Sequence, residues 1–247
     1  MKIAVVGGTG LIGTRLVATL EDQGHDVIVA SRATGVNSYT GEALAEALAG
    51  VETVVDVSNS GYLDEAGARD FFYGSTLNLL TFGAAAGVAH HVALSVVGTD
   101  RLAASEGGYF AAKLAQEKLI AASSLPYSIV HATQFFEFIT SIADAATSAG
   151  VVAVARALIQ PMAADDVAAA VARVAVGAPI GGMVEFAGPE QFRLDDLVRR
   201  GIRSDPREVV ADPLARYFGA RLDEQELLPS PNATLTPTRL ADWLSAP

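Results

Sequence analysis

The first thirteen residues constrain the fold of this chain more than any other stretch. Residues 2–6 form a mostly apolar run that leads straight into a glycine-rich turn, and a helical pattern follows over residues 11–22. An apolar, β-branched run of this length is typical of a buried parallel strand. The chain can turn tightly at Gly7, approach a ligand closely at Gly10, and pack its helix against the sheet at Gly13.

Strand, turn and helix in this order predict a dinucleotide site at the start of the chain. The amides and the positive dipole end of a helix N-terminus suit the pyrophosphate of such a ligand. The alternative is an ordinary glycine-rich turn between a strand and a helix. The residues predicted to bind the dinucleotide here are Gly7, Thr9, Gly10, Leu11, Ile12 and Gly13.

The end of the second expected strand, residues 27–30, indicates which dinucleotide is preferred. A Rossmann protein that prefers NAD places an acidic residue here to bind the ribose 2′-hydroxyl, whereas this chain has Ser31 and Arg32. The Arg32 guanidinium, with the hydroxyls of Ser31 and Thr9, can hold a 2′-phosphate. We therefore expect NADP(H) to be preferred over NAD(H). The alternative for Arg32 is a solvated loop cation.

Further along, the pattern predicts at most a brief strand within 35–40, a short helix over 42–48 and a strand over 53–57. The last of these ends at Ser58 and Asn59. Polar residues at the carboxyl end of a parallel strand are typical of a ligand cleft, so both are assigned to the cofactor cleft. Ordinary turn chemistry explains them equally well.

A long helix is expected over 66–86, with an apolar stripe that predicts core packing. The stripe consists of Phe71, Phe72, Leu77, Leu80 and Phe82. The fifth expected strand follows over 91–98, and a helix begins near Tyr109. Tyr109 and Lys113 are four residues apart on that helix and so share one face.

This pair has a chemical use, because a tyrosine with an ordinary pKa near ~10 is a poor acid at neutral pH. A nearby ammonium favours the phenolate and lowers that pKa. The alternative is a surface tyrosine with Lys113 paired to Glu117. Downstream, a sixth strand is expected over 127–132, and core packing is one interpretation of the aromatic residues that follow it.

Composition excludes several classes of function. A net charge of −11 opposes binding to nucleic acid or to an anionic membrane. The chain has no cysteine, and its four histidines lack ligand spacing, so we expect no metal site; His90 and His91 are interpreted as the solvated entry to a strand. No run approaches the length of a membrane span, and a cytoplasmic location is expected.

The fold class expected is α/β, a Rossmann-type doubly wound parallel sheet with a small C-terminal substrate-binding lobe. Residues 1–247 are expected to form a single NAD(P)-binding domain, with residues 1–133 as the nucleotide-binding core and residues 134–247 as a mixed segment contributing the lobe. Both a monomer and a homodimer remain open.

The chain resembles the short-chain dehydrogenase/reductase superfamily, and more closely its atypical NmrA-like, NAD(P)H-binding branch. The resemblance rests on the glycine turn, the Ser95-Val96-Val97-Gly98 strand end, the Tyr109–Lys113 spacing and the strand that follows Pro126. It implies that Tyr109 is the general acid and that Lys113 is its electrostatic partner and a ribose ligand. It also implies that Ser95 orients the substrate carbonyl and contributes to the cofactor site, and that Asn78 supports a proton relay; Thr99 is the alternative to Ser95.

In the related proteins the segment after the sixth strand lines the substrate site, which implies a flat apolar pocket for an aromatic, quinone or enone substrate. The pocket residues are Gln134, Phe135, Phe136 and Phe138, with core packing as the alternative.

The leading hypothesis is an NADPH-dependent reductase of a small carbonyl, quinone or enone compound. The alternative from another class is an NmrA-like redox sensor that binds the dinucleotide without turnover. An isomerase or dehydratase that retains its nucleotide would use the same motifs.

Overall fold

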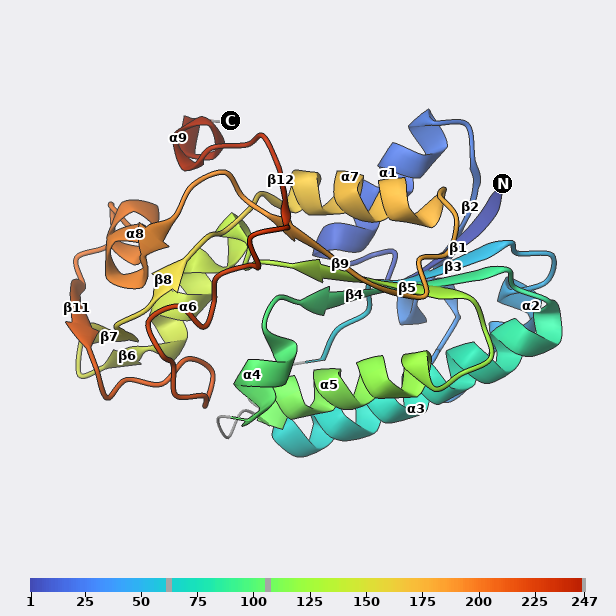
Figure 1. The fold of residues 1–247 in the computed structure, drawn as a ribbon, viewed down its shortest axis with the longest axis horizontal. Coiled ribbons are helices and arrows are strands. Elements are labelled where there is room, and N and C mark those ends of the chain that lie inside the picture. Colours follow the sequence, from blue (N-terminus) through green and yellow to red (C-terminus); the bar gives the residue numbers. More distant parts are fainter. Residues whose placement is uncertain (61–63, 105–107, 246–247) are drawn as a thin grey trace.

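The core of the molecule is a seven-stranded, wholly parallel sheet (Figure 1). The structure is a computed structural model, and it describes residues 1–60, 64–104 and 108–245. The strands of the sheet are β1 (Lys2–Val6), β2 (Asp26–Ala30), β3 (Thr53–Asp56), β4 (His90–Val96), β5 (Tyr127–Ala132), β9 (Gly182–Ala187) and β12 (Thr234–Leu235). Their spatial order is β12-β9-β5-β4-β3-β1-β2. Because the chain runs outward in both directions from β1, the sheet is doubly wound.

Helices cover both faces of the sheet (Figure 1). α1 (Leu11–Asp22) and α7 (Ala164–Ala175) pack together on one face, and α3 (Glu65–Ala86) and α5 (Gly108–Ala121) pack together on the other. Residues alternate between the faces along each strand, so Ile3 and Val5 meet α1 and α7 while Ala4 and Val6 face the opposite side. The near-continuous apolar strands follow from burial on both sides. The expected α/β Rossmann-type fold is confirmed.

A smaller lobe lies beyond the carboxyl ends of the central strands (Figure 1). It contains a three-stranded sheet, a two-stranded sheet, the α-helices α6 and α8 and the short 3-10 helix η2. Its elements are η2 (Phe136–Phe138), α6 (Ile139–Ala145), β6 (Thr147–Ser148), β7 (Val151–Ala155), β8 (Leu158–Ile159), β10 (Phe192–Arg193), α8 (Leu194–Gly201) and β11 (Glu208–Asp212). The remaining elements are η1 (Arg32–Thr34), α2 (Leu44–Ala47), α4 (Thr99–Ala104) and α9 (Leu240–Ser245).

The structure corrects several expectations about individual elements. No strand forms within residues 35–40, where an isolated bridge joins Asn37 to Glu42, so β2 is an edge strand and the expected fifth strand is β4. Leu77 is 42% exposed because it lies on the outward side of α3, away from the core stripe. His90 and His91 are buried, because β4 lies between β3 and β5 in the sheet; His91 pairs with Val54 on one side and with Tyr127 on the other.

Within the described part of the chain, no helix is both long enough and apolar enough to cross a bilayer.

Candidate dinucleotide and active site

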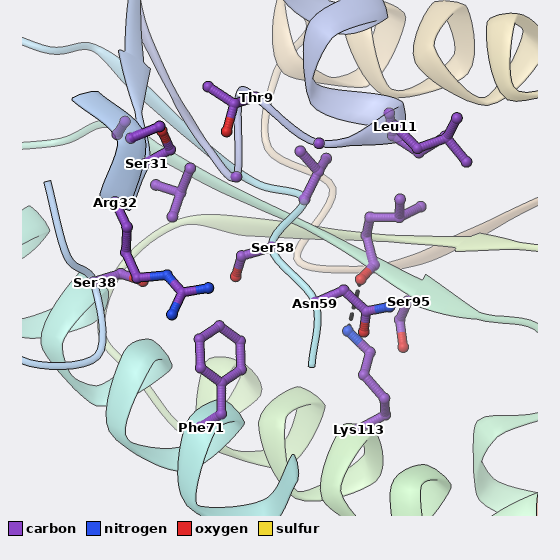
Figure 2. Close-up of a pocket in the computed structure, with 18 of the residues that line it drawn as sticks. Thr9, Leu11, Ser31, Arg32, Ser38, Ser58, Asn59, Phe71, Ser95 and Lys113 are labelled. Atoms are coloured by element: carbon purple, nitrogen blue, oxygen red, sulfur yellow. Dashed lines mark hydrogen bonds between the residues drawn. The ribbon is translucent and has the colours of Figure 1, made fainter. Parts of the chain in front are cut away.

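A pocket of about 460 Å³ opens at the carboxyl ends of the central strands. Its walls come from the turn after β1, the end of β2, the loop after β3, and from α3, β4 and α5 (Figure 2). Most of the residues predicted from the sequence line it: Gly7, Thr9, Gly10, Leu11, Ile12, Ser31, Arg32, Ser58, Asn59, Ser95, Tyr109, Lys113, Phe135 and Phe138. Among its described lining residues the charged side chains are Arg32 and Lys113, and none is acidic. In a chain of net charge −11, this lining favours an anionic ligand.

The glycine turn fits a pyrophosphate by its backbone geometry. Gly7 has φ +81°, and a Cβ there would lie 2.8 Å from the Cα of Ser58. A Cβ on Gly13 would lie 2.1 Å from the Gly7 carbonyl oxygen, so Gly13 serves close packing behind the turn and does not line the pocket. Gly10 caps α1 without a side-chain hydrogen bond, and the first turn of α1 holds no acidic residue. The first amides of α1 are therefore available to a phosphate.

The end of β2 presents a cation to the same pocket. Figure 2 shows the Arg32 guanidinium directed into the pocket, above the ring of Phe71. The turn that carries Arg32 is fixed by Thr34, whose hydroxyl accepts from the Ser31 amide at 3.0 Å and donates to the Val29 carbonyl at 2.8 Å. Arg32 itself is exposed. Ser31 and Arg32 are thus held at the place where a ribose 2′-substituent is bound in Rossmann proteins.

Tyr109 occupies the opposite end of the pocket and is not a surface residue. It is 3% exposed, and its ring packs edge-on against Phe72 and Phe110, with centroids 5.7 and 5.4 Å away. Its hydroxyl donates to the Asn59 side-chain oxygen at 2.8 Å. The phenol therefore has a fixed position next to the loop that follows β3.

Lys113 lies one helical turn after Tyr109 and is also buried. Its ammonium donates to the Leu94 carbonyl at 2.8 Å, marked by the dashed line in Figure 2, and to the Gln116 side-chain oxygen. The alternative pairing with Glu117 is not seen among its hydrogen bonds. Burial lowers the pKa of Lys113 to about 8, while the charges of Asp56 and Glu117 act in the opposite direction.

Ser95 lines the pocket, but its hydroxyl donates to the Glu117 carboxylate. The same carboxylate oxygen lies 3.1 Å from His131 Nε2, and Thr99 Oγ1 lies 3.4 Å from Ser95 Oγ. Burial alone would raise the pKa of Glu117, but hydrogen bonds from His131 and Ser95, together with nearby Lys113, hold it below its ordinary value. Ser95 consequently presents oxygen lone pairs, rather than its hydrogen, to the pocket.

The model of the NAD dependent epimerase/dehydratase family matches residues 3–136, which is more than half of the chain. The chain belongs to this family. The match spans the glycine turn, the strands from β1 to β5 and the Tyr109–Lys113 helix, and the expected relationship to the short-chain dehydrogenase/reductase superfamily is confirmed. Membership places the chain among NAD(P)-dependent enzymes, and the pocket is the part of the structure that fits such a cofactor.

Two solved structures that are similar to this chain agree with the fold described above. The chain is 26% identical to the NADPH-dependent quinone oxidoreductase QOR2 of Escherichia coli, solved with NADPH, with a TM-score of 0.64 over 86% of this chain and 78% of that chain. It also matches the UDP-glucose 4-epimerase of Thermotoga maritima, at 17% identity and a TM-score of 0.69 over 91% of this chain and 90% of that one. At that identity the second likeness shows the fold alone.

A curated relative is the photosystem II assembly factor Ycf39 of Synechocystis sp., which is 27% identical over 151 residues. The match covers 56% of this chain and 46% of that protein, so this chain spans about half the length of the relative.

Besides Gly13, three predicted site residues lie outside the described lining of the pocket. The Asn78 amide donates to the carbonyls of Ser38 and Tyr39, at 2.9 and 2.8 Å, and so braces the loop after β2 rather than the tyrosine. Gln134 and Phe136 are buried, because the chain after β5 turns their side chains away from the pocket. Phe136 packs against the ring of Trp243, with centroids 5.4 Å apart.

Other residues of the pocket were not predicted from the sequence. Phe71 was expected in the core stripe of α3, and Ser38 was not considered, yet both line the pocket. Glu117, the partner of Ser95, was considered only as a partner of Lys113. Its position four residues after Lys113, on the same face of α5, was the signal that it would reach the site.

Among the described residues, no three His, Asp or Glu side chains gather closely enough to hold a metal ion.

Proposed function

We propose that the protein is an NADPH-dependent reductase that acts on a small carbonyl, quinone or enone compound. The observation that carries this proposal is the pocket itself, where Arg32 and Lys113 are the charged side chains of the described lining and a buried tyrosine lies beside the lysine. The likeness to the NADPH-dependent quinone oxidoreductase of Escherichia coli supports the same reaction class.

The preference for NADPH rests on the end of β2. Ser31 and Arg32 stand where a carboxylate would bind the 2′-hydroxyl of NAD, and the Arg32 guanidinium points into the pocket (Figure 2). A guanidinium binds a phosphate through charge-assisted hydrogen bonds that a hydroxyl cannot match. The ribose 2′-phosphate of NADPH therefore gains an interaction that NADH lacks.

The bound dinucleotide would supply the hydride. The chain supplies the proton and the orientation. The Tyr109 hydroxyl is the acid, and the Lys113 ammonium at the same end of the pocket stabilises the phenolate that forms when the proton leaves. Lys113 also holds the nicotinamide ribose by the hydrogen left over from its bonds to Leu94 and Gln116.

The substrate proposal rests on two aromatic rings. Phe135 and Phe138 stack with centroids 5.3 Å apart and an interplanar angle of 22°, and both line the pocket. Stacked rings offer a flat apolar surface that suits a planar substrate, such as an aromatic aldehyde, quinone or enone. The oxygen of Ser95 faces the same space as an acceptor, so it suits a substrate that also carries a hydroxyl or amide donor.

The test is NADPH consumption against a panel of quinones, aldehydes, ketones and enones, with NADPH and NADH affinities measured in parallel by titration calorimetry. Turnover of a panel member that Tyr109→Phe removes supports the reductase. Tight binding without turnover on the whole panel favours the redox sensor. Interconversion of a substrate without net NADPH loss favours the isomerase or dehydratase suggested by the family name.

A further inference from the structure

A row of buried polar side chains runs behind the pocket from Lys113 to β3. Gln116 and Asp56 are each only 2% exposed, and neither is among the residues that line the pocket. The Gln116 side-chain oxygen accepts from Lys113, and its Nε2 donates to Asp56 Oδ2 at 3.1 Å and to Thr76 Oγ1 at 3.2 Å. Gln116 thus joins the Lys113 ammonium to the carboxylate of Asp56, which precedes Gln116 by 60 residues in the sequence.

The same carboxylate also holds the loop that carries the partner of Tyr109. Asp56 Oδ1 accepts from the Ser58 amide at 2.9 Å and from the Ser58 hydroxyl at 2.6 Å. Asn59, the next residue, accepts from the Tyr109 hydroxyl. Both Tyr109 and Lys113 are therefore anchored to the end of β3 through hydrogen bonds that start at Asp56.

The direction of these bonds admits one orientation of the Gln116 amide. An ammonium only donates and a carboxylate only accepts, so the amide oxygen faces Lys113 and the amide nitrogen faces Asp56. A flipped amide would bring donor against donor at one end and acceptor against acceptor at the other. A buried charge without such partners is costly, so this arrangement has a physical reason to persist.

Few other groups near Lys113 can offset the positive charge of its ammonium. From α5, Glu117 contributes its charge, and from α3 the ring of Phe72 lies under Nζ at 4.6 Å. β4 contributes the Leu94 carbonyl, and its His91 faces Asp56. β5 contributes His131, which binds Glu117.

We propose that Gln116 and Asp56 are positioning residues that keep Lys113 charged and leave one of its three hydrogens directed at the pocket. Two of these hydrogens are used on Leu94 and Gln116. Asn78 was expected to support Tyr109 and Lys113, but its amide binds the loop after β2. Gln116 and Asp56 provide the buried support instead. Only the use that Lys113 makes of its charge rests on the proposed function.

The test uses the small number of lysines in this chain, which are Lys2, Lys113 and Lys118. Protein labelled with ¹³C at the lysine Cε gives one signal for each, and the variants Lys2→Arg and Lys118→Arg together assign the three signals. The signals are followed by NMR against pH without cofactor or substrate. We expect Lys113 to titrate at about pH 8 in the parent protein.

Two variants then remove the connection. Gln116→Met keeps the length of the side chain without its amide, and Asp56→Asn removes the charge and faces the Gln116 amide with a second amide. Each is expected to lower the Lys113 midpoint by about one pH unit or more, with the Lys118 midpoint unchanged as the internal reference. Glu117→Gln is the matched control, because it removes a carboxylate from α5 that has no hydrogen bond to the ammonium. We expect it to shift Lys113 less than Asp56→Asn does.

An unchanged Lys113 midpoint in folded Gln116→Met overturns the proposal. So does a larger shift in Glu117→Gln than in Asp56→Asn. If the variants do not fold, hydrogen exchange at the lysine Nζ of the parent protein decides. Slow exchange at Lys113 with fast exchange at Lys118 supports the buried hydrogen bonds, and equal exchange contradicts them. Because no turnover is measured, a protein that proves to have no reductase activity leaves this result intact.

Discussion

The two ends of the pocket hold their cations in opposite ways. Arg32 is exposed at the tip of an edge strand, on a turn whose fixed hydrogen bonds belong to Thr34 and the backbone. Lys113 is buried on α5, between two packed helices and the sheet, with two hydrogen bonds and two nearby carboxylates. The pocket thus has one positive charge at a solvated end and another at an end shielded from water.

The difference indicates what each end is suited to do. An exposed guanidinium binds a phosphate and adjusts its geometry at little cost, but water screens its field. A buried ammonium acts with much less screening on a group beside it, and its pKa responds to every neighbouring charge. We therefore expect substitutions at the Arg32 end to change cofactor choice, and substitutions at the Lys113 end to change chemistry and stability.

The largest effect is expected for Tyr109→Phe, at the buried end. The change keeps the ring packing against Phe72 and removes the hydroxyl that we propose as the proton donor. We expect kcat to fall by roughly 10²–10⁴-fold, with the dissociation constant for NADPH nearly unchanged. Steady-state kinetics and calorimetry measure both quantities. Parent-like turnover would remove Tyr109 from the mechanism and with it the assignment of chemistry to this end.

The next largest effect concerns pH. The pKa of Lys113 is lowered to about 8, so its charged form predominates below that value and is lost as the pH rises through it. We expect kcat/KM to fall on the alkaline side near pH 8, and Lys113→Met to have low activity, reduced by roughly 10²-fold, without that limb. An alkaline limb that persists in Lys113→Met would show that another group titrates there.

At the exposed end, Arg32→Ala is expected to weaken NADPH binding by roughly 10- to 100-fold, which corresponds to a charge-assisted hydrogen bond or two. NADH binding should change little, and the melting temperature should stay within about 1 °C because Arg32 is exposed. An equal loss of affinity for both dinucleotides would contradict the 2′-phosphate assignment.

The smallest effect is expected for Glu117→Gln, which tests stability at the buried end. The pKa of Glu117 is lowered in the folded protein, so its charge adds stability above the ordinary carboxylate pKa and this contribution is lost as the pH falls. The variant should be less stable than the parent by about 1 kcal/mol at pH 7, and the gap should start to close only as the pH falls below the ordinary glutamate pKa of 4.5. Thermal unfolding across this pH range measures the difference, and a constant gap would contradict the assignment.

Local patterns were enough to predict the parts of the site that are adjacent in sequence. The turn at Gly7 and Gly10 is encoded by neighbouring residues, and Tyr109 and Lys113 share a face because both lie on one helix. The partners of these residues were not predictable in the same way. Gln116 meets Asp56 only because α5 packs over the end of β3, and spacing along the chain contains no sign of that contact.

Burial was predicted less well than element type, for the same reason. His90 and His91 read as polar residues at a strand entry, but the order of the sheet places β4 in its interior. Asn78 lies on the expected helix, yet the rotation of α3 directs its amide to the loop after β2. The orientation of a helix about its axis depends on everything it packs against, which one sequence pattern does not contain.

The edge position of β2 has a consequence for engineering. In the described part of the chain β2 pairs only with β1, and residues 35–40 lie at the Arg32 end of the pocket as irregular chain that Asn78 ties to α3. A replacement of this segment would leave every strand pairing of the central sheet intact. Because the proposed 2′-phosphate ligands Ser31 and Arg32 directly precede this segment, we expect a loop grafted over residues 31–40 to change the cofactor preference while the buried residues around Lys113 keep their contacts.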